Sequence, residues 1–185
     1  RPEQDWIEQL LLANAPVGEE TVVAVTGRTI FQTHTDLVSR FRAVEIASKY
    51  RSRPRRTSLA NGPCSMFNRQ ALIDVGGFDP NWYHAEDMEV SLRLLNVGGS
   101  IVYAPDALVS HVPEIGVRRF LRKRRRDARA HVRIVRHYPS RQRSGPGFDF
   151  IGSASIAFSI LPITLLMLLS FIPMILALPI SGDLL

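Results

Sequence analysis

The chain has 185 residues, a length that fits one domain or one domain with an added segment. It is basic, with 23 Lys and Arg against 17 Asp and Glu, and its single cysteine excludes an internal disulfide framework. About half of the basic residues lie between Arg118 and Arg143, whereas residues 151–182 carry no charge. The net charge is therefore a local feature that precedes a long apolar stretch.

Hydrophobic periodicity predicts an alternation of helices and short strands, which is typical of a layered α/β domain. The expected elements, in chain order, are a helix over residues 5–13, a strand over 21–26, a helix over 36–50, a strand within 59–69, a helix over 70–75, a helix over 87–97, strands over 101–104 and 107–112, and a helix over 117–138. Gly27 is expected to end the first strand, and residues 105–106 to form a turn between the last two.

Three smaller features of the first half concern packing. Leu37, Phe41 and Val44 are expected to form the apolar face of the second helix. The basic stretch at residues 51–56 is expected to be a solvated loop, with phosphate contact as the alternative. Cys64 is expected in the core, as a small apolar residue.

Small residues mark two turns in the middle of the chain. Asn61 and Gly62 lead into an apolar strand, where small residues either form an ordinary turn or let backbone amides approach a ligand closely. Gly76 and Gly77 follow a short helix, and glycine at that position relieves left-handed strain.

An acidic pair, Glu86 and Asp87, opens an amphipathic helix. Carboxylates are common there because they suit the positive end of the helix dipole, so a helix start explains the pair on its own. Adjacent carboxylates also raise each other's pKa, which suits a catalytic base. His111 stands at the end of a strand, where a lone histidine is more often structural than a ligand.

The helix over residues 117–138 combines an apolar stripe with many basic residues. The stripe consists of Val117, Phe120, Leu121, Ala128, Val132 and Val135. Such a helix fits a membrane interface, where long basic side chains reach the lipid headgroups. Nucleic-acid binding is the rival interpretation.

The apolar stretch at residues 148–180 favours the membrane. It exceeds the roughly 20 residues needed to cross a bilayer. Pro162, Pro173 and Pro179 interrupt it, so a single crossing is expected, with a re-entrant hairpin as the alternative.

Taken in order, these segments resemble the inverting glycosyltransferases of family 2, which have the GT-A nucleotide-sugar-binding fold. Four segments carry the resemblance: residues 5–11, similar to the helix after the family's metal-binding Asp-x-Asp; residues 61–79, similar to its acceptor-side strand, helix and turn; Glu86 and Asp87, similar to its Glu-Asp motif; and residues 101–111, similar to the segment that ends in its late histidine. The resemblance implies the C-terminal part of a GT-A fold, a mixed sheet with flanking helices, followed by a basic amphipathic interfacial helix and a transmembrane helix.

The resemblance also implies roles for the matching positions. Asp87 would be the general base and Glu86 would position the acceptor, while His111 would bind a divalent metal, Mg²⁺ or Mn²⁺. The implied substrate-binding residues are Asn61, Gly62, Gly76 and Gly77. The implied partners are a nucleotide-sugar donor and a sugar or lipid-linked acceptor.

Two departures from the family pattern qualify this expectation. The nucleotide-binding half and its Asp-x-Asp would lie ahead of Arg1, so the chain alone is expected to be inactive. The processive synthases carry Gln-x-x-Arg-Trp in the interfacial helix, but residues 118–130 contain neither Gln nor Trp. This difference favours transfer of a single sugar over polymerisation.

Three segments follow from these expectations: a catalytic part at residues 1–115, an interfacial helix and linker at 116–147, and a transmembrane segment at 148–182. Positive charge beside an apolar span favours the cytoplasmic side, so the catalytic part is expected to face the cytoplasm and to contact lipids between Arg118 and Arg143. The alternative function is a non-catalytic, membrane-anchored basic binding or scaffold module.

Overall fold

The computed structural model describes residues 1–51, 53–113, 115–139, 142 and 165–170. The chain divides into two compact units, Arg1–Asp149 and Phe150–Leu185. Residues 165–170 of the second unit are helical, and the remainder of the predicted span lies outside the described residues. Within the described ranges, no helix is both long and apolar enough to cross a bilayer. The transmembrane segment therefore stays a prediction.

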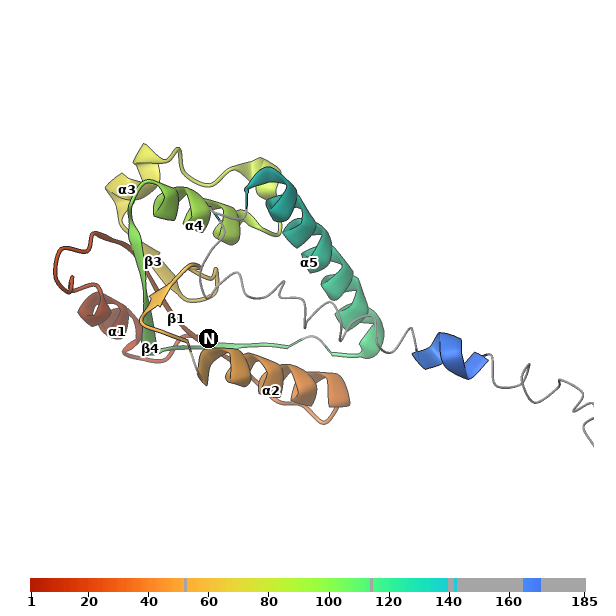
Figure 1. The fold of residues 1–185 in the computed structure, drawn as a ribbon. Helices are drawn as coiled ribbons and strands as arrows, with labels where there is room; N and C mark the ends of the chain where they lie inside the picture. Colours follow the sequence, from red (N-terminus) through yellow and green to blue (C-terminus); the bar gives the residue numbers. More distant parts are fainter. Residues whose placement is uncertain (52, 114, 140–141, 143–164, 171–185) are drawn as a thin grey trace, which may run out of the picture. The chain divides into compact units, whose positions relative to one another are not determined.

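The first unit is built on a four-stranded mixed sheet with the order β2-β4-β1-β3 (Figure 1). The two central strands, β1 (Val22–Phe31) and β4 (Ser100–His111), are parallel neighbours. Two short strands, β3 (Ser65–Phe67) and β2 (Arg56–Thr57), pair antiparallel with β1 and β4 respectively. The predicted α/β class with a mixed sheet is confirmed.

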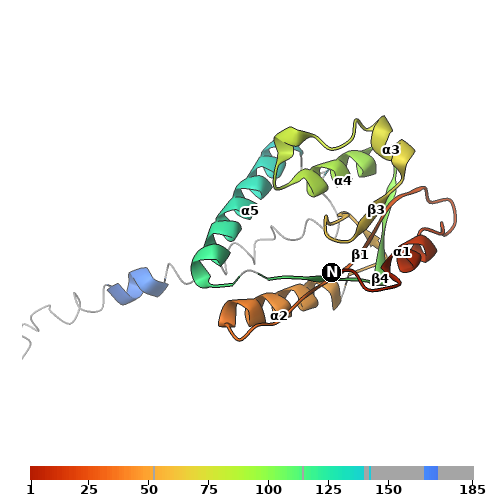
Figure 2. The ribbon, with the colours of Figure 1, turned by 180° about the vertical axis from the view of Figure 1, so that it is seen from behind.

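Helices pack on both faces of this sheet, as the two opposite views show (Figure 1 and Figure 2). On one face, α1 (Trp6–Ala13) buries Leu10 against the central strands. On the other face lie α3 (Arg69–Asp74) and α4 (Glu86–Asn96). A short 3-10 helix, η1 (Pro80–Trp82), connects them.

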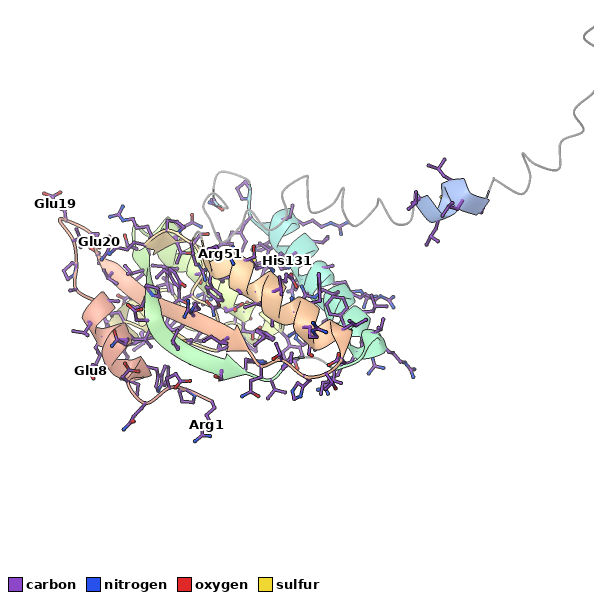
Figure 3. All side chains as sticks on the ribbon, turned by 90° about the horizontal axis from the view of Figure 1, so that it is seen from below. Arg1, Glu8, Glu19, Glu20, Arg51 and His131 are labelled. Atoms are coloured by element: carbon purple, nitrogen blue, oxygen red, sulfur yellow. The ribbon has the colours of Figure 1, made fainter. Side chains whose placement is uncertain are left out.

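Two longer helices complete the unit. α2 (Leu37–Arg51) packs along β1 and lies beside α5 (Val117–His137), to which Glu45 is joined by Arg124 at 3.8 Å. Figure 3 marks the pair by Arg51 on α2 and His131 on α5. The predicted boundaries of the helices agree with the structure to within one or two residues.

Gly27 does not end its strand, because β1 continues to Phe31. The glycine is needed for a close approach instead. A Cβ atom at Gly27 would lie 2.3 Å from the carbonyl oxygen of Ala107 and 2.4 Å from the sulfur of Cys64. Cys64 itself is fully buried, as expected, and burial raises the pKa of its thiol.

The turn predicted at residues 105–106 is a bulge within one continuous strand. Thr26 of β1 pairs with Tyr103, but Arg28 pairs with Leu108, so β4 contains extra residues at this point. A bulge lets a strand take up additional residues while the pairing on either side continues. The two strands expected here are therefore a single element.

The predicted apolar face of α2 is wrong. The side chains expected in the core are largely exposed: Leu37, Phe41 and Val44. The helix instead buries Ser39 and Arg42. The Arg42 guanidinium lies 5.2 Å from the centre of the Phe31 ring and pairs with Glu45. A long arginine side chain can cover apolar surface with its stem, which a simple apolar pattern does not anticipate.

In the stretch at residues 51–56, Arg55 and Arg56 are exposed, as expected of a solvated segment, but they and Arg53 also contact protein groups. The Arg53 guanidinium lies over the rings of Tyr50 and Tyr103, at 5.5 and 5.4 Å from their centres. Arg55 pairs with Glu20 and lowers the pKa of that carboxyl to about 2. The basic side chains of this stretch are thus engaged by protein groups.

The predicted stripe of α5 is exposed, and a different face of the helix is buried. Ala130 and Ile134 pack against residues of η1 and α4, chiefly Trp82, Met88 and Leu92. Val117, Leu121 and Val132 are more than half exposed. Apart from Phe120, whose ring lies 6.1 Å from that of Phe41 on α2, the predicted lipid-facing stripe is left largely exposed.

Candidate active site

The acidic pair begins α4, and its two carboxylates differ in environment. Glu86 is exposed, whereas Asp87 is partly buried. Just before the helix, the backbone of His84 has a positive φ of 75°. Among the described residues, no other non-glycine residue has a positive φ. Left-handed backbone at a non-glycine residue costs free energy and is often associated with functional sites.

The carboxylate of Asp87 is held by backbone amides. Its Oδ2 accepts a hydrogen bond from Gly62 N at 3.2 Å, and its Oδ1 accepts one from Met88 N at 2.8 Å. Burial raises the pKa of Asp87, the two amides oppose that rise, and the nearby charge of Glu86 adds to it. A carboxyl with a raised pKa is a stronger base once ionised, as general-base catalysis requires.

Asn61 fixes the backbone that presents the Gly62 amide. Its Oδ1 accepts from Thr26 Oγ1 at 2.6 Å, and its Nδ2 donates to Tyr50 Oη at 3.1 Å and to Thr29 Oγ1 at 3.3 Å. Both amide hydrogens of Asn61 are therefore used within the protein. The predicted substrate contacts of Asn61 and Gly62 stay predictions, and their described contacts position Asp87.

The same segment is attached to α4 at a second point. Ser91 Oγ accepts a hydrogen bond from Ala60 N at 3.1 Å and donates one to the carbonyl of Asp87 at 2.6 Å. Ser91 is fully buried, so these bonds satisfy a polar group that water cannot reach.

Gly76 and Gly77 end α3 in a Schellman motif. Gly77 N donates to Leu72 O and Gly76 N to Ile73 O, both at 2.8 Å. Their φ angles are +86° and +71°, which favour glycine. The helix-ending role expected for both is confirmed, whereas their role in substrate binding stays a prediction.

Arg93 connects this turn to α4. Its side chain donates to the carbonyl oxygens of Val75 and Gly77 and also pairs with Glu89 at 2.6 Å. Glu89 is only 3% exposed and was not among the residues predicted from the sequence. The spacing of Glu89 and Arg93, four residues apart on one helix, is a signal that could have identified the pair.

His111 lies on a different element, at the end of β4. Its ring stacks on Phe31 with the ring centres 5.0 Å apart, and its Nδ1 lies 2.7 Å from the carbonyl oxygen of Val112. Because a carbonyl can only accept, this contact favours the neutral tautomer with the proton on Nδ1, in which Nε2 has the lone pair that a metal ion needs. The His111 imidazole is therefore suited to act as one ligand of a metal ion.

A complete metal site is not assembled by the part of the chain that the structure describes. No group of three or more His, Cys, Asp or Glu side chains comes together there. The contacts seen for His111 are with Phe31 and Val112, not with Asp87. The site residues thus fall into two places. Asp87 and its contacts lie at the start of α4, and His111 lies separately at the C-terminal end of β4.

The structure shows a mixed α/β domain with a partly buried carboxylate at the start of α4, and comparison with known proteins identifies the family. The chain belongs to glycosyl transferase family group 2, whose model matches residues 8–182. Its resemblance to family 2 glycosyltransferases is thereby confirmed.

Curated relatives point the same way. The chain is similar to the pre-mycofactocin glycosyltransferases of two strains of Mycobacterium tuberculosis, with 29% identity over 117 residues. The match covers 60% of this chain but 24% of each relative, so the chain spans about a quarter of the length of these proteins.

The raised pKa of Asp87 predicts a stability effect with a definite sign. A raised folded-state pKa means that the ionised carboxylate destabilises the fold at pH values above that pKa, and that this cost disappears below the unfolded value. We expect the free energy of unfolding of the wild type, relative to that of Asp87→Asn, to fall as the pH rises from about 4 to about 8, because only the wild type gains a charge at this position. Urea titration at both pH values measures the difference. Glu86→Gln, at the exposed neighbour, is the matched control and should change stability little at either pH.

Proposed function

We propose that this chain is part of an inverting glycosyltransferase of the GT-A fold, which moves one sugar from a nucleotide-sugar donor to an acceptor hydroxyl. Asp87 is the general base, and Glu86 beside it positions the acceptor. The observation that carries this proposal is the partly buried Asp87 carboxylate, which the Gly62 amide holds and whose pKa is raised by burial.

The proposed reaction is a direct displacement. Asp87 takes the proton of the acceptor hydroxyl while the hydroxyl oxygen forms a bond to the anomeric carbon. The bond between that carbon and the diphosphate oxygen breaks, and the nucleoside diphosphate leaves. The turn at Gly76 and Gly77 would contact the acceptor together with Asn61 and Gly62. A bound Mg²⁺ or Mn²⁺ supplies charge neutralisation at the departing diphosphate.

His111 is proposed as the metal ligand contributed by this chain. The pairing of the N-terminal segment supports this role, because Pro2 bridges to Val109 and Ser110 N donates to the Arg1 carbonyl at 2.7 Å. An Asp-x-Asp immediately ahead of Arg1, as the family resemblance suggests, would continue this antiparallel pairing toward His111. Its carboxylates would then supply the oxygen ligands that these metals prefer.

The proposed setting is the cytoplasmic face of a membrane. The exposed apolar stripe of α5 and the arginines beside it support lipid contact between Arg118 and Arg143, and the uncharged residues 151–182 suit an anchor. Transfer of one sugar, rather than polymerisation, is proposed because residues 118–130 contain neither Gln nor Trp. The name of the curated relatives makes pre-mycofactocin one acceptor to test beside lipid-linked sugars.

The assignment of the base is tested by Asp87→Asn in a full-length protein that carries this chain. The amide cannot accept the hydroxyl proton, so sugar transfer should fall by at least about 100-fold. Calorimetric binding of the nucleotide-sugar donor should remain close to that of the wild type. Transfer at the wild-type rate by the variant would remove Asp87 from the reaction.

The metal assignment is tested by His111→Ala in the same protein. Loss of one ligand should raise the Mn²⁺ concentration that gives half-maximal transfer by about tenfold or more. The matched control is His131→Ala on α5, because this histidine takes no part in the proposed site. An unchanged metal titration in the His111 variant would contradict the proposed ligand.

The membrane assignment is tested by flotation with vesicles. The full-length protein in which Leu121 and Val132 are both replaced by Ser should bind anionic vesicles more weakly than the wild type, because the exposed apolar stripe is shortened. Oligonucleotide binding is measured in parallel. Tight, salt-dependent binding to oligonucleotides in preference to vesicles would favour the nucleic-acid interpretation.

A further inference from the structure

A buried carboxylate that the proposed reaction does not use lies two residues after Asp87, on nearly the opposite side of α4. Glu89 is 3% exposed, yet its oxygens are well supplied with hydrogen bonds. Its Oε1 accepts from Tyr138 Oη at 2.7 Å and from Arg93 Nε at 2.8 Å, and its Oε2 accepts from Arg93 Nη2 at 2.6 Å. Buried charges are retained where they are paired in this way.

The Arg93 guanidinium extends this group of contacts to the glycine turn. Nη2 donates to the Gly77 carbonyl at 2.7 Å, and Nη1 donates to the Val75 carbonyl. A single planar group thus joins two carbonyls of the turn after α3 to a carboxylate of α4. The fork geometry of arginine allows this, whereas a lysine ammonium presents one point charge.

Tyr138 brings α5 into the same group of contacts. It follows the last residue of α5, and its hydroxyl donates to the carboxylate that orients Arg93. Burial and the neighbouring Glu89 raise the pKa of Tyr138 to about 12, so the hydroxyl keeps its proton at physiological pH. The end of α5, the middle of α4 and the turn after α3 are therefore tied together.

We propose that Arg93, oriented by Glu89 and Tyr138, is a positioning residue that holds the Gly76 and Gly77 turn at a fixed place relative to Asp87. The base and the arginine are carried by the same helix, so the contact sets the distance between the base and the acceptor-side turn. This inference rests on the proposed function, in which that turn contacts the acceptor. It assigns a specific task to three residues that take no part in the chemistry.

The expected consequence is a selective loss of acceptor affinity. Loosening the turn misplaces the acceptor without changing the carboxylate that takes its proton. Three variants remove the contacts in steps: Arg93→Lys loses the fork, Glu89→Gln keeps the shape but loses the charge, and Tyr138→Phe loses one hydroxyl. Gln70→Ala is the matched control, because it removes an exposed contact to Asp74 on α3 without touching the turn.

The experiment measures transfer kinetics, donor hydrolysis without acceptor, and amide hydrogen exchange in the full-length protein. Arg93→Lys should raise the acceptor KM by about tenfold or more, since it loses charge-assisted hydrogen bonds, while kcat at saturating acceptor and donor hydrolysis stay near the wild-type values. Glu89→Gln and Tyr138→Phe should raise it less, in that order. Exchange at the amides of Gly76 and Gly77 should accelerate in step with KM.

Two outcomes would overturn the inference. One is an Arg93→Lys protein with a wild-type acceptor KM and unchanged exchange at the turn. The other is a fall in kcat at constant KM across all three variants, which a general loss of folded protein would produce. Failure of the proposed function is recognised separately, by undiminished transfer in Asp87→Asn. In that case faster exchange at Gly76 and Gly77 in Arg93→Lys would still report the structural tie, but its role in acceptor binding would fall with the reaction.

Discussion

Helix α4 is packed between two other layers, and the positions of the site residues depend on this packing. Val90 and Leu94 are buried against the sheet, whereas Met88 and Leu92 are buried against α5 and η1. Residues four apart lie on one side of a helix, and residues two apart lie on nearly opposite sides. The helix is therefore fixed in rotation by apolar contacts on two opposing sides.

The two remaining sides of the helix carry the polar groups. Asp87 and Ser91 occupy one of them and bind the backbone at residues 60–62. Glu89 and Arg93 occupy the other, where Glu89 pairs with Arg93 and Arg93 binds the turn after α3. Because apolar packing fixes the rotation, neither polar side can move without the other. The base, the amide that holds it and the glycine turn are thus parts of one rigid arrangement.

Local signals predicted much of this fold, and long-range contacts account for what they missed. The helix end at Gly76 and Gly77 and the acidic start of α4 depend only on neighbouring residues in the sequence. Both features were therefore predicted correctly. The contact between Asp87 and Gly62 joins residues 25 apart, and its existence depends on how strands and helices pack. The buried face of α2 was wrong for the same reason, because Arg42 is covered by tertiary partners that helical periodicity does not contain. Glu89 illustrates both cases: its pairing with Arg93 is local, whereas its bond to Tyr138 is not.

The bulge in β4 determines the direction of His111. Side chains alternate between the faces of a sheet, so Val102, before the bulge, should share its face with even-numbered residues. After the bulge, the same core cluster instead contains the odd-numbered Ala107 and Val109. The number of inserted residues is therefore odd. As a result, odd-numbered side chains after the bulge, up to His111 at the end of β4, lie on the face that even-numbered side chains occupy before it. Without this odd insertion, strict alternation along β4 would place His111 on the opposite face of the sheet from Val102.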